Sequence, residues 1–193
     1  KILKEDVRTS HIPIILLTAK DSLQDKEEGY QVGADSYLTK PFSATLLHSR
    51  INNLLESRKR LTERFNTSTP HHNMDEKRAL LAESLNKLDN EFIEKINQLI
   101  EARLSSEKID IGYLADNMCM SKSTLYRKMK ALTGLSTNEY VRKIKMQHAE
   151  RLLLEGRYNI SEVAFRVGIN SVVYFRQCFK EEFGVLPSEY LKQ

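Results

Sequence analysis

The feature that most constrains this chain is an internal repeat in its C-terminal half. The second copy has one extra residue in its turn, and the copies otherwise align in order: residues 111–118 with 160–167, 125–129 with 175–179, and 134–140 with 184–190. Each copy has the pattern of a short helix, a tight turn, and a second helix that ends at a glycine, Gly134 or Gly184. The repeat therefore predicts two helix-turn-helix units.

The second helix of each copy has an apolar stripe and a polar outer face. Apolar residues recur at helical spacing, at 125, 129 and 132 and again at 175, 179 and 183. Small residues, Ala115 and Ala164, stand where two helices must cross closely, and Ser121 and either Asn170 or Ser171 can cap the second helices. The outer faces have the side chains that a helix needs to read base edges in a major groove: Ser123, Tyr126, Arg127, Lys130, Val172, Arg176, Gln177 and Lys180.

The segment between the copies predicts one long helix, from Thr137 to Glu155, that ends at Gly156. Its 19 or so residues give a length of roughly 28 Å, close to the pitch of DNA at about 34 Å. Such a helix could hold two reading helices in successive major grooves on one face of a duplex. Three cations of this segment are predicted to contact phosphates: Arg142, Lys143 and Lys145. Three others are predicted to contact phosphates or solvent, and the first of them is also counted among the DNA contacts: Lys122, Lys128 and Arg166.

The net charge of the chain is only weak evidence for a polyanionic partner. The position of the basic excess, at the C-terminal end, is stronger evidence. The formal net charge is +4, and residues 105–193 alone hold 14 Lys and Arg against 10 Asp and Glu. Taken in isolation, Tyr126 is explained by packing on a neighbouring helix, and Arg127 and Arg176 are better explained as solvated surface charges than as DNA contacts. Their matching places on two repeats favour DNA reading.

These residues resemble the AraC/XylS family of bacterial transcription regulators, over about residues 89–193. The segments that carry the resemblance are 160–164, 167–168, 174–175, 179–180 and 183–190. The resemblance implies two helix-turn-helix units joined by a long helix, with Val173 added to the reading residues of the second unit; Ser171 is also counted among the DNA contacts. The chain departs from the family at Ile169, where an aromatic residue is usual, and at Val172 and Val173, where many members have polar residues.

The N-terminal part has a different pattern. Residues 12–19 form a short apolar run that predicts a strand buried on both faces, and residues 21–32 predict a helix that ends at Gly33. Residues 36–39 predict a second strand, and Ser43 predicts the cap of a helix with its apolar face at residues 46, 47, 51, 54 and 55. The fold class is therefore mixed: an incomplete parallel α/β unit followed by an all-α double helix-turn-helix domain. We place the boundaries at 1–65, 66–88 (a linker and helical connector) and 89–193.

Residues 12–19 and 33–42 resemble the latter half of a response regulator receiver domain. Thr18 and Lys40 match the positions that bind the phosphoryl group in that family, and Tyr37 matches its switch aromatic; spacing alone leaves them ordinary edge residues. The resemblance implies a cis Lys40–Pro41 bond. The family's acidic cluster and phosphoacceptor aspartate would precede Lys1, so we expect no phosphorylation of this fragment in the family's manner. Because half a parallel sheet exposes an edge, residues 1–55 are expected to be unstable alone, to pair with another copy, or to dock on the helical domain.

The organisation resembles the cytoplasmic end of a hybrid two-component sensor, or a response regulator. We expect double-stranded DNA as partner, RNA polymerase and a second copy as further partners, a cytoplasmic location, and no membrane contact, cofactor or metal. His71 and His72 lack a third ligand at zinc-like spacing, and Cys119 and Cys178 are expected to be reduced and half-buried. The alternative function is a protein-interaction adaptor. An enzyme is disfavoured because no nucleophile–base pair, phosphate loop or metal cluster is present, and kinase chemistry would lie outside this chain.

Overall fold

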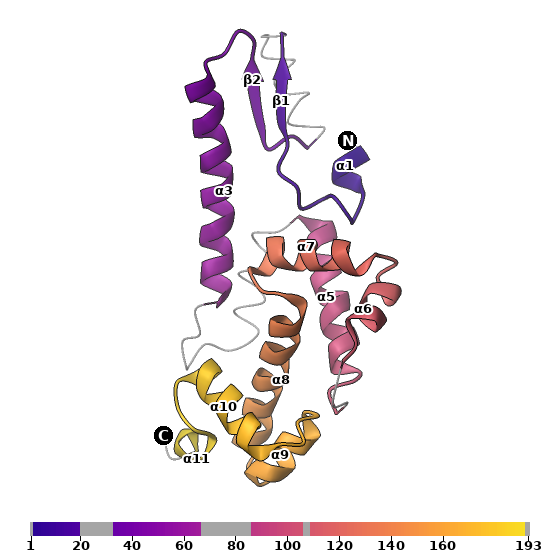
Figure 1. Ribbon diagram of the computed structural model, residues 1–193, viewed down its shortest axis with the longest axis vertical. Coiled ribbons are helices and arrows are strands. Elements are labelled where there is room, and N and C mark those ends of the chain that lie inside the picture. The colour runs from indigo at the N-terminus through magenta and orange to yellow at the C-terminus, as the bar shows by residue number, and fades with distance from the viewer. Residues whose placement is uncertain (1, 20–32, 67–85, 106–108, 192–193) are drawn as a thin grey trace.

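The computed structural model describes residues 2–19, 33–66, 86–105 and 109–191 of the chain. Its N-terminal part contains two strands and two helices, and every described element after residue 86 is a helix (Figure 1). The elements are, in order, α1 (Ile2–Glu5), β1 (Ile15–Thr18), β2 (Ser36–Thr39), α3 (Ala44–Asn66), α5 (Lys87–Glu101), α6 (Ile111–Asn117), α7 (Lys122–Thr133), α8 (Thr137–Leu154), α9 (Ile160–Arg166), α10 (Val172–Phe183) and α11 (Pro187–Tyr190).

The two strands form a parallel sheet in which Ile15 pairs with Ser36 and Thr18 with Thr39. This confirms the incomplete parallel sheet and both strand predictions, and the Lys40–Pro41 bond is cis as expected. The prediction that the first strand is buried on both faces is wrong, because Leu17 is 43% exposed. An apolar run is buried on both faces only where layers cover both, and in the described residues β2 is the one strand paired with β1.

Helix α3 begins where its cap predicts, since the Ser43 Oγ accepts the Leu46 backbone N–H at 3.2 Å. Its apolar face is mostly open, with Leu46, Ile51 and Leu55 exposed. The helix runs to Asn66, which we had assigned to the linker. The predicted helix over 21–32, the rest of the linker segment 67–73 and the two linker histidines lie outside the described residues.

The helical part contains the two predicted units, α6 with α7 and α9 with α10, joined by α8. Ser121 and Ser171 cap α7 and α10 by accepting a backbone N–H three residues on, and Gly134 and Gly184 end these helices in the left-handed conformation. Both α7 and α10 have 12 residues, and both α6 and α9 have seven. The repeat in the sequence is thus a repeat in structure.

Each unit has its own apolar core, and α8 contributes to both. The first core joins α5, α6 and α7 with Tyr140 and Ile144 at the start of α8. The second joins α9 and α10 with Met146, Ala149 and Leu153 further along α8. Because one continuous helix is shared by the two cores, the units are held in a fixed relation through α8.

The two turns are nearly superimposable in their hydrogen bonds. Met120 N–H donates to the Ala115 carbonyl at 2.9 Å, and Ile169 N–H donates to the Ala164 carbonyl at the same distance. Both alanines are buried at the helix crossing, as predicted. Ile169, where the chain departs from the AraC/XylS pattern, is buried in the second core. Its side chain therefore has a packing role.

The cysteines differ from expectation and from each other. Both are free thiols, but Cys119 is exposed in the turn of the first unit and Cys178 is buried in the core of the second. The expectation that both are half-buried is wrong, because Cys178 faces inward on α10 whereas Cys119 protrudes from a turn. In the described residues no helix is long and apolar enough to cross a membrane.

Candidate nucleic-acid interface

The outer face of α7 is open to solvent along its length. Leu125, Met129 and Leu132 face the first core, and this fixes the opposite side of the helix outward. The predicted contacts on that side are all exposed: Lys122, Ser123, Tyr126, Arg127 and Lys130. Tyr126 is 49% exposed, so about half of its side chain is open to solvent. The helix therefore offers hydroxyl, phenol and cationic groups on one surface.

The start of α7 is ordered by hydroxyl groups. The Ser121 Oγ accepts the Thr124 N–H at 3.1 Å and lies 3.0 Å from the Ser123 Oγ. Arg127 Nε donates to the Ser123 carbonyl at 3.3 Å, so the guanidinium lies along its own helix towards the N-terminal turn. This contact restrains an exposed arginine in advance of any ligand.

The outer face of α10 is built in the same way but with a different chemistry. Val173 is 77% exposed, Arg176, Gln177 and Lys180 are exposed, and Val172 is half-buried. Ser171 uses its hydroxyl as the helix cap, accepting the Tyr174 N–H at 3.2 Å. Apolar methyl groups beside an arginine and an amide suit contacts with thymine methyl groups and base edges.

The amide of Gln177 and the cation at Arg142 meet on one acidic side chain. Gln177 Nε2 donates to the Glu181 Oε1 at 3.2 Å, and Arg142 of α8 lies 3.4 Å from the other Glu181 oxygen. Arg142 also interacts with the hydroxyl of Tyr174. The pKa of Tyr174 is raised, first by its contact with the Cys178 thiol. A cluster of side chains thus joins α8 to the outer edge of α10.

Tyr174 follows the predicted contacts Val172 and Val173 on α10 but is not among the site residues predicted from the sequence. It is 50% exposed on α10, and its place in the repeat corresponds to Thr124 on α7. In the sequence it belongs to the segment 174–175, which carries part of the family resemblance.

Three lysines predicted to contact phosphate or solvent are buried, and these predictions are wrong. Lys128 lies on the inner face of α7 and pairs with Asp89 at 2.5 Å. Lys143 pairs with Glu182 of α10 at 3.5 Å, and Lys145 donates to the Gly168 carbonyl at 3.3 Å. Their positions on the helices place the ammonium groups between elements, where each finds an acceptor. Arg166 is exposed and stacks over the Tyr158 ring at 3.8 Å.

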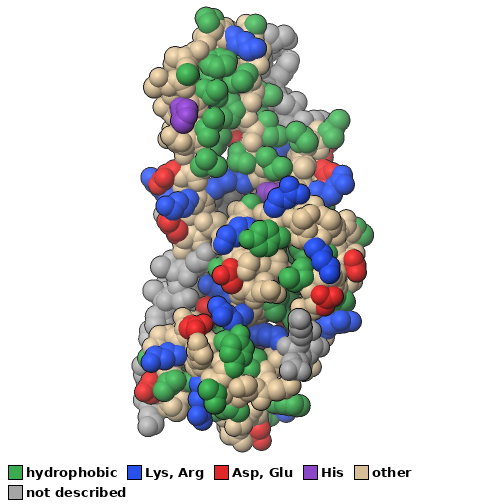
Figure 2. Space-filling model, in the orientation of Figure 1, with side chains coloured by type: hydrophobic (Ala, Val, Ile, Leu, Met, Phe, Trp, Pro, Cys, Tyr) green, Lys and Arg blue, Asp and Glu red, His purple; other side chains and the backbone are tan. Residues whose placement is uncertain are grey.

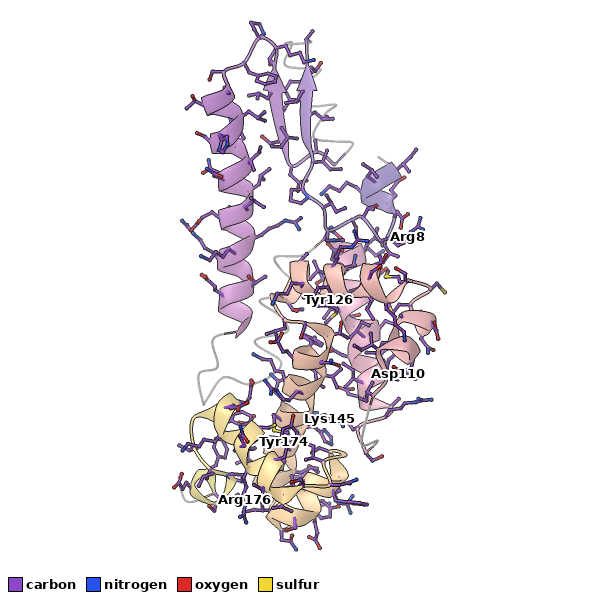
Figure 3. The ribbon with its side chains drawn as sticks, in the orientation of Figure 1. Arg8, Asp110, Tyr126, Lys145, Tyr174 and Arg176 are labelled. Carbon is purple, nitrogen blue, oxygen red and sulfur yellow. The ribbon has the colours of Figure 1, made fainter. Side chains whose placement is uncertain are left out.

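The two reading helices lie towards opposite ends of α8 (Figure 1), and Figure 3 shows Tyr126 on α7 well apart from Arg176 on α10. At 1.5 Å per residue, the 18 residues of α8 span about 27 Å. On the face in Figure 2, Lys and Arg are interspersed with acidic and apolar side chains over the helical part. Any DNA contact there combines cations with apolar and hydrogen-bonding groups.

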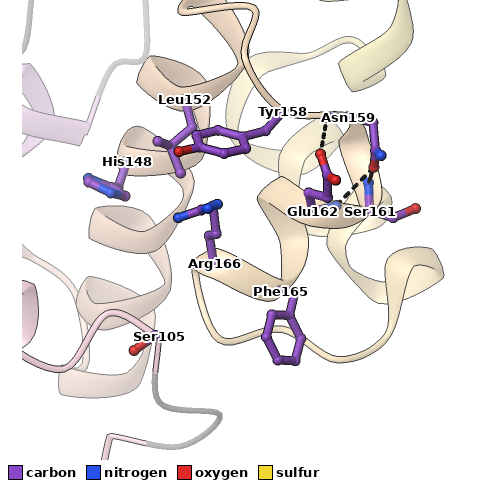
Figure 4. Close-up of a pocket in the computed structure, with 9 residues that line it drawn as sticks. All are labelled: Ser105, His148, Leu152, Tyr158, Asn159, Ser161, Glu162, Phe165 and Arg166. Carbon is purple, nitrogen blue, oxygen red and sulfur yellow. Dashed lines mark hydrogen bonds between the residues drawn. The ribbon is translucent and has the colours of Figure 1, made fainter.

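A groove lies between α8 and α9 (Figure 4), and none of its lining residues belongs to α7 or α10. It is lined by the Arg166–Tyr158 stack, by Leu152 and by Phe165. His148 also lines it, and burial is the main cause that lowers the pKa of this histidine. Among the described residues no group of His, Cys, Asp and Glu side chains is arranged to hold a metal ion.

Two of the receiver-type residues, Thr18 and Lys40, lie together at the carboxyl end of the small sheet, whereas Tyr37 lies nearer the start of β2, opposite Leu16. Thr18 ends β1, Tyr37 lies half-buried within β2, and Lys40 follows β2. Lys40 N–H donates to the Thr18 carbonyl at 2.7 Å, which brings the two backbones side by side. The carboxyl ends of parallel strands are where ligands bind in such sheets. The phosphoryl-binding role of these residues stays a prediction.

Comparisons with known proteins match the two parts of the chain separately. The family model of a helix-turn-helix domain matches residues 114–193, and that of a response regulator receiver domain matches residues 1–52. The chain is 35% identical over 188 residues to histidine kinase P4 of Formosa agariphila, covering 97% of this chain and 13% of that protein.

Other relatives match about half of the chain. The transcriptional regulator Rns of Escherichia coli is 32% identical over 99 residues, covering 51% of this chain and 37% of Rns. The C-terminal domain of AraT, a response regulator from Geobacillus stearothermophilus, is 31% identical with a TM-score of 0.48, covering 52% of this chain and 84% of that one. The chain spans well under half the length of both curated relatives.

Proposed function

We infer that the helical part of this chain belongs to the AraC-type helix-turn-helix family and its N-terminal part to the response regulator receiver family, which the matches of the two family models support. From this premise we propose that the chain is a sequence-specific, double-stranded DNA-binding transcription regulator of a two-component phosphorelay. Its two reading helices, α7 and α10, enter adjacent major grooves. The boundaries of the parts remain those proposed from the sequence, 1–65, 66–88 and 89–193.

One observation supports the proposal most directly. The two units have the same construction and lie towards opposite ends of α8, and in each the outer face of the second helix, α7 or α10, is open to solvent. Arg127 and Arg176, the two arginines assigned to base reading, are both exposed on those faces. Arginine is the residue that most often makes specific contacts with guanine in a major groove. Buried arginines in either unit would have been incompatible with this role.

The test begins with selection of bound sequences from a random pool of DNA duplexes by the full chain. Gel-shift titrations on the selected site then compare the wild type with Arg127→Ala and Arg176→Ala. Each substitution should cost about 1–3 kcal/mol of binding free energy and relax specificity at one position of the site. Unchanged discrimination between sequences in both variants would contradict the assignment.

Arg151→Ala is the matched control. Arg151 is also exposed and arginine, but it lies on α8 against His148 and away from the reading faces. Arg151→Ala should leave the affinity and the sequence specificity of DNA binding unchanged.

DNA binding should also weaken steeply with salt, because phosphate contacts release counterions. Binding that is insensitive to salt and to DNA sequence would favour the adaptor alternative.

The further partners belong to the same proposal. The chain acts in the cytoplasm, with RNA polymerase and a second copy as partners on the DNA, as part of a response regulator or of the cytoplasmic end of a hybrid sensor. Its similarity to part of a protein named as a histidine kinase supports the second arrangement. In that case kinase chemistry belongs to a part of the protein outside this chain, and Thr18, Tyr37 and Lys40 belong to its signalling site.

A further inference from the structure

Lys128 has a complete and unusual set of partners inside the protein. Its side chain is 0% exposed and lies on the inner face of α7. The Nζ donates to the Asp89 Oδ1 at 2.5 Å, to the Ser10 Oγ at 2.8 Å and to the Val7 carbonyl. An ammonium group has three donors, and all three are used. Two of the three acceptors belong to the N-terminal segment.

The acceptors are themselves locked together. The Ser10 Oγ donates to the Asp89 Oδ1 at 2.6 Å, and Asn86 Nδ2 donates to the other Asp89 oxygen at 2.9 Å. Ser10 is fully buried, and Val7 packs against the first apolar core. The N-terminal segment therefore occupies a prepared site on α5 and α7, as the docking alternative from the sequence foresaw.

The second unit has no buried charge at the position equivalent to Lys128. The repeat counterpart of Lys128 is Cys178, a small neutral side chain buried in the second core. The second reading helix is instead fastened to α8, through the Lys143–Glu182 pair and near the turn through Lys145 and the Gly168 carbonyl. The same core position thus holds a neutral residue in one unit and a charge with distant acceptors in the other.

We propose that residues 7–11 are a docking segment for the first helix-turn-helix unit, and that Lys128 is the positioning residue that couples this segment to the first reading helix. Withdrawal of the segment leaves a buried ammonium with one of its three acceptors. An under-satisfied buried charge is costly, so α7 must shift or loosen to hydrate it. The N-terminal part thereby acts on one reading helix and not on the other.

The consequence for DNA rests on the proposed function, whereas the docking itself does not. Residues 7–11 leave the outer face of α7 exposed, so the docked segment supports that face without covering it. We expect the docked state to be the one in which both units read DNA. The undocked state retains the second unit and weakens the half of the site read by the first.

Hydrogen exchange of the full chain tests the docking without DNA. Ser10→Ala removes one acceptor of Lys128 from the segment and should speed exchange of the α7 amides roughly tenfold, with α10 unchanged. Thr9→Ala is the matched control, because the Thr9 hydroxyl donates to the Leu3 carbonyl of α1 at 2.7 Å and not to a partner of Lys128. Exchange in α7 that stays at the wild-type rate, or that rises equally in α10, would overturn the proposal.

A double variant separates coupling from general destabilisation. Lys128→Met with Asp89→Leu replaces the buried pair by apolar side chains, which is often tolerated. In this background Ser10→Ala should no longer change exchange in α7, because the charge that needs the segment is gone. An undiminished effect of Ser10→Ala in the double variant would show that Lys128 is not the coupling residue.

Footprinting on the selected site tests whether docking of the segment affects DNA binding by the first unit. The half-site of the first unit is the one that loses protection in Arg127→Ala. Ser10→Ala should weaken protection of that half by on the order of tenfold and leave the other half unchanged. Equal weakening of both halves would contradict the proposal. If the wild type protects no DNA, the proposed function fails while the exchange results still decide the docking.

Discussion

At the residue scale, the contact between the two parts of the chain gathers ionisable groups around one histidine. His11 is 7% exposed, and its Nδ1 has no hydrogen-bond partner within the described part of the chain. The charged groups that face it are Lys128 of α7, Asp89 of α5, Arg58 of α3 and Lys4 of α1. Burial, and then the positive charge of Lys128, lower the pKa of His11 from 6.5 to about 4.

This histidine makes stability depend on pH. Because the pKa is lower in the folded state, the unfolded state binds more protons between about pH 6.5 and pH 4. The contribution to the free energy of unfolding is complete above this window and is lost as pH falls through it, by about 1–3 kcal/mol. Urea unfolding of the full chain at a series of pH values measures the slope.

His11→Gln should flatten the curve in that window. His48→Gln, which changes an exposed histidine of α3, should leave the wild-type slope in place. A curve for His11→Gln as steep as that of the wild type would show that other groups cause the loss of stability.

The cations show how far residue roles could be predicted from the sequence. Arg127 and its neighbour Lys128 have the same charge, yet one faces solvent and the other the core. The repeat contained a signal for this: Lys128 lies three residues after buried Leu125 and aligns with an apolar position in the second copy. Its acceptors, at 39 and 118 residues away in the chain, could not be predicted from local pattern.

At the element scale, the two helix-turn-helix turns have the same left-handed backbone conformation at one position but different residues there. The turn requires a left-handed residue at equivalent places, which are Cys119 with φ of 53° and Gly168 with φ of 67°. Glycine adopts this conformation without steric cost, whereas a residue with a Cβ is strained by about 1–2 kcal/mol. The first unit therefore stores strain that the second avoids.

Exchanging these residues should have opposite effects on stability. Cys119→Gly should raise the free energy of unfolding by about 0.5–1 kcal/mol, since relief of strain exceeds the entropy gained by the unfolded chain. Gly168→Cys should lower it by about 1–2 kcal/mol. Chemical denaturation under reducing conditions measures both. If both substitutions destabilise, Cys119 contributes a contact in the turn that outweighs its backbone strain.

The elements themselves were largely predictable wherever both ends carried a capping residue. Serine before and glycine after define α7 and α10 in the sequence, because these residues satisfy the free backbone groups at helix ends. The exposure of β1 and of the apolar face of α3 was not predictable in this way. Periodicity shows which side chains share a face, but which layer covers that face depends on contacts between distant segments.

At the scale of the whole molecule, α8 decides what the two units can do together. Its buried residues belong to the first core near Tyr140 and to the second near Leu153, so it is a structural member of both units. Its N-terminus carries a capping box of Ser136 and Glu139, and this contact lowers the pKa of the Glu139 carboxyl. A flexible tether would let each unit find its half-site independently, whereas this helix fixes their separation and their relative rotation.

A fixed separation predicts a strict spacing of half-sites in the DNA. Inserting 5 bp between the two half-sites of the selected site places the second on the opposite face of the duplex, and binding should fall to that of one unit. Inserting 10 bp restores the face but adds about 34 Å, which α8 cannot span. Both insertions should therefore weaken binding by at least about 100-fold, the advantage that linkage provides.

Gel-shift titrations with the wild type and with Arg176→Ala measure this directly. On the sites with insertions, the wild type and Arg176→Ala should bind with nearly the same affinity, because only the first unit remains engaged. As a control, the same insertions placed outside the half-sites should not change the affinity. Affinity that is retained at both 5 bp and 10 bp is the outcome for units on a flexible tether. It would mean that the two cores can separate along α8, and that the shared helix does not hold the reading helices at one pitch of the duplex.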